Sequence, residues 1–86
     1  LTMYILVNII LHIGMNSIPQ VHVITNFNSL EICEAKFDET LSRLKGENKK
    51  GFITTTKENK KYLEILDTDK KLKSYWICNE VIFYKK

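Results

Sequence analysis

Two histidines, His12 and His22, are the only imidazole groups of the chain. A pair of imidazoles can bind zinc or copper, or relay a proton. The turn-forming stretch at residues 14–19 lies between them, so a β-hairpin would place them side by side. No third ligand stands at a metal-binding spacing. We therefore expect two half-exposed strand residues, with no metal and no cofactor.

The two cysteines, Cys33 and Cys78, form neither a CxxC pair nor a Cys/His signature. Three states are open to them: two buried thiols, a disulfide that ties a helix to a sheet, or one reactive nucleophile. We favour buried thiols, because such cysteines are common and the chain shows no secretory signature.

Most carboxylates occupy places that local structure explains, at a helix start or in a turn. Glu64 and Glu80 are the exceptions, because both lie in strand-like segments. Either would become a candidate general acid or base if it were buried beside Tyr62 or Tyr75. The sequence contains no phosphate loop, nucleophile elbow or HExxH motif. A small enzyme with an active site at a subunit interface stays an alternative without a supporting motif.

Lysines crowd two turns in the C-terminal half of the chain, and aromatic residues lie on the adjoining strands. Lysine side chains bind the phosphates of a nucleic-acid backbone, and aromatic rings stack on unpaired bases. This pattern therefore predicts a surface that binds single-stranded nucleic acid weakly. The candidate residues are Lys57, Lys60, Lys61, Lys70, Lys71, Lys73, Tyr62, Tyr75 and Trp76. The competing interpretation is that lysine-rich turns only solvate the protein and protect strand edges.

The uncharged N-terminal segment alternates like a strand from Met3 to Met15. Every odd position is apolar, whereas the even positions are mixed, so we expect the odd face to lie in the core. The even face would then leave Tyr4, Leu6 and Ile10 uncovered. An uncovered apolar surface on so small a domain predicts a homo-oligomer or a contact with a host protein.

The remaining elements follow from turn and capping residues. The hairpin should pair Leu11 with Val23 and bring His12 opposite His22. A helix is expected over residues 29–45, capped by Asn28, with a stop at Gly46. Further strands are expected over residues 51–56, 61–66 and 72–83, with Phe52 paired to Ile65. The prediction is an α+β domain over residues 3–84, in ββαβββ order, with an antiparallel sheet of about five strands and one covering helix.

Composition supports one small globular domain. The chain has 86 residues, of which 44% are hydrophobic and 27% charged, with a net charge of +3. Residues 1–30 contain no Asp, Glu, Lys or Arg, so the charge is confined to the rest of the chain. The N-terminal apolar run is shorter than a membrane span and lacks the basic start of a signal peptide. We expect no membrane span and a cytoplasmic location.

Two short motifs carry a resemblance. The helix start Ser29-Leu30-Glu31-Ile32-Cys33-Glu34 and the closing-strand motif Trp76-Ile77-Cys78 resemble small accessory proteins of tailed bacteriophages. The chain departs from the simplest pattern by the hairpin at residues 51–66. The resemblance implies an accessory role in a bacterial host cytoplasm, and it implies no catalytic residue.

Overall fold

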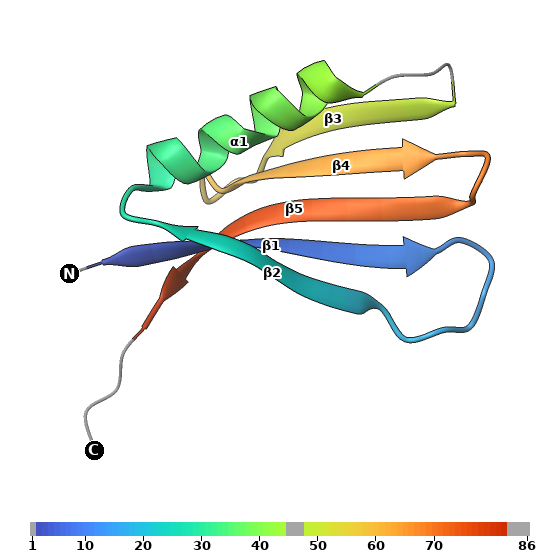
Figure 1. Cartoon of the computed structure of the whole chain (residues 1–86), viewed down its shortest axis with the longest axis horizontal. Coiled ribbons are helices and arrows are strands. Elements are labelled where there is room, and N and C mark those ends of the chain that lie inside the picture. Colours follow the sequence, from blue (N-terminus) through green and yellow to red (C-terminus); the bar gives the residue numbers. More distant parts are fainter. Residues whose placement is uncertain (1, 45–47, 83–86) are drawn as a thin grey trace.

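A computed structural model describes residues 2–44 and 48–82 of the chain. It contains the strands β1 (Met3–His12), β2 (Gln20–Phe27), β3 (Lys49–Thr55), β4 (Lys61–Asp67) and β5 (Leu72–Val81), and the helix α1 (Leu30–Arg43). The strands form one antiparallel sheet in the order β2-β1-β5-β4-β3, and α1 lies across one of its faces (Figure 1). The predicted α+β class and the ββαβββ order are confirmed.

The N-cap of the helix lies one residue later than predicted. Ser29, rather than Asn28, is the N-cap, and its hydroxyl accepts a hydrogen bond of 3.2 Å from the backbone N–H of Glu31. The predicted stop at Gly46 lies outside the described residues. At the other end of the helix, β3 passes close beneath it at Gly51. A Cβ there would overlap Leu41, so glycine permits this approach.

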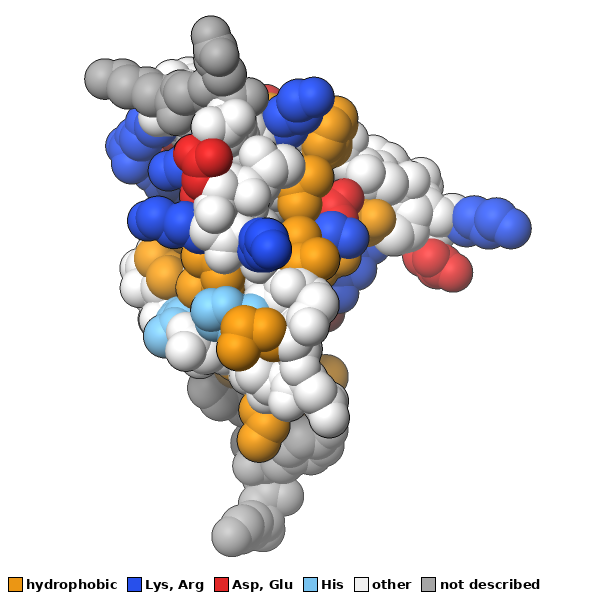
Figure 2. All heavy atoms as spheres, turned by 90° about the vertical axis from the view of Figure 1, so that its right-hand side faces the viewer, with side chains coloured by type: hydrophobic (Ala, Val, Ile, Leu, Met, Phe, Trp, Pro, Cys, Tyr) orange, Lys and Arg blue, Asp and Glu red, His pale blue; other side chains and the backbone are white. Residues whose placement is uncertain are grey.

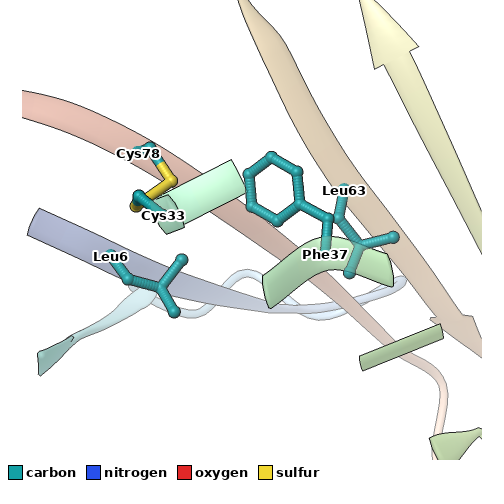
Figure 3. Packing of buried hydrophobic residues seen from close by; sticks show 5 residues of the cluster. All are labelled: Leu6, Cys33, Phe37, Leu63 and Cys78. Atoms are coloured by element: carbon teal, nitrogen blue, oxygen red, sulfur yellow. A yellow bond between two sulfur atoms is a disulfide. The ribbon is translucent and has the colours of Figure 1, made fainter. Parts of the chain in front are cut away.

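The core lies between α1 and the sheet. Its buried residues are Leu6, Cys33, Phe37, Leu63 and Cys78 (Figure 3). Phe37 is 1% exposed and Leu63 0% exposed, so the helix buries its apolar stripe against the middle of the sheet.

Cys33 and Cys78 form a disulfide, with their Cα atoms 6.1 Å apart (Figure 3). The prediction of two buried thiols is therefore wrong. The bond joins α1 to β5 across 45 positions of sequence. Sequence spacing could not show this contact, because it depends on where the helix lies over the sheet.

Both predicted hairpin registers are wrong. In the first, Val23 pairs with Val7 instead of Leu11, because the connection spans residues 13–19 and β2 starts to pair only at Gln20, opposite Ile10. In the second, Phe52 pairs with Glu64 instead of Ile65. A shift of one residue exchanges the faces of a strand. Its physical cause is a three-residue loop at residues 57–59, in which Asn59 takes a left-handed conformation with φ 61°.

Candidate functional site

The predicted interface residues lie on the face of the sheet that α1 covers. Leu6 is only 4% exposed and belongs to the core, so its predicted place on an uncovered face is wrong. Tyr4 packs against the same core and Ile10 is half-buried. Alternation identified two faces of β1 correctly, but it contains no information on which face receives the helix.

The opposite face of the sheet, here called the open face, therefore carries the odd positions of β1. Within the described ranges, no helix or strand packs on it (Figure 1). Strand register and alternation assign its main side chains as Met3, Ile5, Val7, Ile9, Leu11, Val21, Val23, Lys50, Phe52, Tyr62, Glu64, Leu66, Lys73, Tyr75 and Ile77. Sequence reasoning placed the β1 members in the core and did not single out Val21, Val23 or Phe52.

Exposure on the open face is greatest at its two edges. Val21 and Val23 on β2 are 61% and 65% exposed, and Phe52 on β3 is 52% exposed. Val7, in the middle, is 7% exposed because its neighbours on adjacent strands surround it. The open face is thus a continuous apolar layer beside β1, with water in contact with its margins.

The β4–β5 part of the open face is aromatic and carries a charged pair. The rings of Tyr62 and Tyr75 lie 6.0 Å apart at 55°, and Lys73 Nζ lies 5.9 Å from the Tyr75 ring centre. Lys73 also forms an ion pair of 3.1 Å with Glu64. The hydrogen bond to Glu64 is the main reason that the pKa of Lys73 is raised above its ordinary value. The charges of this part of the face compensate each other.

The predicted nucleic-acid residues do not form one surface. One end of the sheet, where a loop joins β3 to β4, carries Lys57, Lys60 and Lys61. The opposite end, where a turn joins β4 to β5, carries Lys70 and Lys71. Because β4 has seven residues between them, the two groups are separated by roughly 20 Å at about 3.3 Å per residue. The predicted clustering of lysines with aromatic rings holds only for Lys73 with Tyr62 and Tyr75.

Trp76 lies on the helix-covered face, opposite Asn8 on β1. Its indole nitrogen is buried and has no hydrogen-bond partner in residues 2–44 and 48–82. Trp76 is partly buried on the other face of the sheet from Tyr62 and Tyr75, so it does not share a surface with them.

The histidines are not brought together by strand pairing. His22 lies opposite Asn8, and His12 lies opposite Leu72 on the other neighbour of β1. The predicted register that placed His12 and His22 side by side is therefore wrong. In the described part of the chain, no group of three or more His, Cys, Asp or Glu residues could hold a metal ion.

The acidic candidates lie apart as well. Glu64 pairs with Lys73 on the open face, directly opposite Tyr75. Glu80 is exposed and lines a hollow of about 250 Å³ beside the disulfide, with Tyr4, Glu34 and Glu58 among its neighbours. A second hollow of about 230 Å³ lies between β2 and α1, and neither histidine lines it. Neither hollow joins the predicted acidic and imidazole groups into one site.

Comparison with known proteins adds no relative: no protein-family model, curated protein or solved structure matches the chain. Within the described residues, α1 has 14 residues and no helix meets the length and apolarity needed to cross a membrane. No relative therefore indicates a function, and the open face is the feature of the structure that points to one.

Proposed function

We propose that this protein acts by binding, and that it associates with a second copy of itself through the open face. The observation that carries the proposal is the apolar layer of β1, β2 and β5, which lies on the side of the sheet away from α1. Exposed apolar surface of this extent is usually covered by a partner. A dimer that buries the same face on both copies satisfies two-fold symmetry.

Area supports a second copy as the occupant. Five strands about 4.8 Å apart and some eight residues long, at about 3.3 Å per residue, give a face of roughly 600 Å². Standard interfaces bury about 800 Å² of accessible surface per partner, and a pleated face offers more accessible area than its flat outline. The whole open face is thus of the size that a stable dimer requires.

Charge points the same way. The β1 and β2 portion comes from residues 1–30, which carry no Asp, Glu, Lys or Arg. Lys73 and Glu64 neutralise each other on the β4–β5 portion. Lys50, at the β3 edge of the face, forms no ion pair with a described residue. Two copies of a protein with a net charge of +3 would therefore meet with little repulsion over β1, β2, β4 and β5, away from that edge.

The test is the oligomeric state over a range of protein concentrations, measured by sedimentation velocity. Val23→Lys should raise the dissociation constant by about 100-fold or more, because it would bury an unpaired charge. Ile32→Lys is the matched control, since Ile32 is 55% exposed but lies on α1. A monomer at all concentrations, or equal weakening by both substitutions, would contradict the proposal. Far-ultraviolet circular dichroism would verify that both variants fold.

The Tyr62–Tyr75 pair favours single-stranded nucleic acid as a second candidate partner. Neighbouring aromatic rings on an open sheet can stack on bases, and Lys73 lies beside them. Glu64 counts against this candidate, because its carboxylate already forms an ion pair with Lys73. Binding of labelled single-stranded DNA or RNA that weakens steeply with salt and on Tyr75→Ala would favour this candidate over the dimer.

The biological setting proposed from the sequence is that of a phage-like accessory protein, with a host protein as a further candidate partner. This rests on the motifs around Cys33 and Cys78 alone. The cytoplasmic location stays a prediction, and the disulfide counts against it, because disulfides persist mainly in oxidising compartments. Determining the thiol content of protein isolated under alkylating conditions would test the location directly.

A further inference from the structure

One end of the sheet combines an exposed apolar loop with lysines. The loop at residues 13–19 connects β1 to β2, and the β4–β5 turn at residues 68–71 lies at the same end (Figure 1). The backbone N–H of Ile13 donates a hydrogen bond of 2.8 Å to the carbonyl oxygen of Lys71. This bond holds the start of the loop against the turn, so the two segments present one surface, here called the loop end.

The apolar side chains of the loop end extend into solvent. Ile18 is 88% exposed, Met15 65% and Ile13 44%. The loop carries no charge, and Gly14 adopts a left-handed conformation, with φ 77°, that lets the chain turn there. Ile18 is the most exposed large apolar side chain in the described ranges, and nothing in the core accounts for its placement.

Lysines lie at the same end of the sheet. Lys70 and Lys71 lie in the turn beside the start of the loop, whereas Lys49 and Lys50 begin β3, at the edge of the sheet three strands away from β1. Figure 2, which looks onto this end, shows Lys and Arg side chains gathered in the upper part of the view, with exposed hydrophobic side chains beside and below them. None of these four lysines forms an ion pair with a residue in the ranges 2–44 and 48–82.

The acids at this end are engaged in local hydrogen bonds. Asp67 accepts one of 3.1 Å from the backbone N–H of Lys70, and Asp69 accepts one of 2.7 Å from the Asn48 side chain. Four lysines against two carboxylates leave a local charge of +2 (4 − 2). This end of the sheet therefore combines an apolar loop with a net positive charge.

We propose that the loop end docks onto the surface of a bilayer that contains anionic lipids. Met15 and Ile18 would enter the boundary between headgroups and acyl chains, and the lysines would contact lipid phosphates. A second copy is a poor occupant of this end, because it would set four lysines against four like charges. Nucleic acid fits poorly as well, because the exposed side chains of this loop are aliphatic and provide no stacking surface. The inference does not depend on association through the open face.

The test is co-sedimentation of the purified chain with vesicles of phosphatidylcholine alone, or of phosphatidylcholine and phosphatidylglycerol in about equal parts. Binding should need the anionic lipid and weaken with salt. Lys70→Gln with Lys71→Gln should lower the partition coefficient about 25-fold, at about fivefold for each lysine. Met15→Ser with Ile18→Ser should lower it about tenfold or more, because the apolar contribution is lost.

Lys57→Gln with Lys61→Gln is the matched control, because it removes the same charge from the opposite end of the sheet. It should change the partition coefficient by no more than about twofold. The proposal would be overturned by absence of binding, by equal binding to both vesicle types, or by an equal loss in the control. It would also be overturned if the Met15 and Ile18 variant bound normally, or if it altered the oligomeric state instead. Thermal unfolding of each variant would verify that all are folded.

Discussion

Both faces of the sheet carry apolar side chains on β1, but only the even-numbered positions, which also include Asn8 and His12, lie on the face that α1 covers. Leu6 is one of them and is 4% exposed, whereas the odd-numbered row meets Val21 and Val23, which are mostly exposed. The covered face also has a covalent tie to its helix, through Cys33 and Cys78. Apolar composition alone therefore does not distinguish a core face from a face that no helix covers. The position of the helix decides which is which.

The largest effect that separates the two faces should come from one pair of phenylalanines. Phe37→Ala opens a cavity in the core and should lower the free energy of unfolding by about 3–5 kcal/mol. Phe52→Ala on the open face should lower it by less than about 1 kcal/mol, because Phe52 is 52% exposed. Urea unfolding of both variants measures the difference. Equal losses would mean that the open face is as well packed as the covered one.

The second-largest effect on the free energy of unfolding should come from the disulfide. Replacing both cysteines, Cys33→Ala with Cys78→Ala, should lower the free energy of unfolding by about 4 kcal/mol, because the unfolded chain regains the freedom of a long closed loop. The comparison is sharpened by treating the unchanged protein with a thiol reductant, which should produce a similar loss while retaining both sulfur atoms. If neither change affected stability, the covered face would depend on packing alone.

The smallest effect concerns the ion pair on the open face. Glu64→Gln should lower the pKa of Lys73 toward its ordinary value, because the carboxylate that stabilises its charged form is lost. A raised folded-state pKa contributes stability that is complete below the unfolded-state value of a lysine. That contribution disappears as pH rises through the folded value, so the stability loss that the pair causes on raising pH should lie in alkaline solution, and Glu64→Gln should reduce it.

Titration of Lys73 by NMR would measure this shift. Lys36 and Glu39 on α1 are the control pair, joined at 2.8 Å. There it is the pKa of Glu39 that is lowered, mainly by its hydrogen bond to Lys36, so stability should fall in acid instead. An alkaline stability loss that Glu64→Gln left unchanged would show that the Lys73 pair does not support the sheet.

Local signals in the sequence were sufficient for the elements. Alternation in β1, turn residues between strands, and the polar cap before α1 each act over a few neighbours, so the α+β class and the ββαβββ order could be predicted. The candidate site was predicted less well. Tyr62, Tyr75 and Lys73 do meet on one face. Trp76 and Leu6, in contrast, lie on the covered face.

Tertiary structure alone decided which face became the core. The pairing of β1 with β5 joins the two ends of the chain, and the Cys33–Cys78 bond joins residues 45 positions apart. No pattern of neighbouring residues specifies such contacts, because their stability comes from burial that exists only when distant segments meet. Hairpin register failed for a related reason: a longer connection or a single left-handed residue such as Asn59 shifts every later pair. The amino-acid sequence thus determined which segments are strands and helix and where charge is absent, while packing decided which apolar surface stays available for a partner.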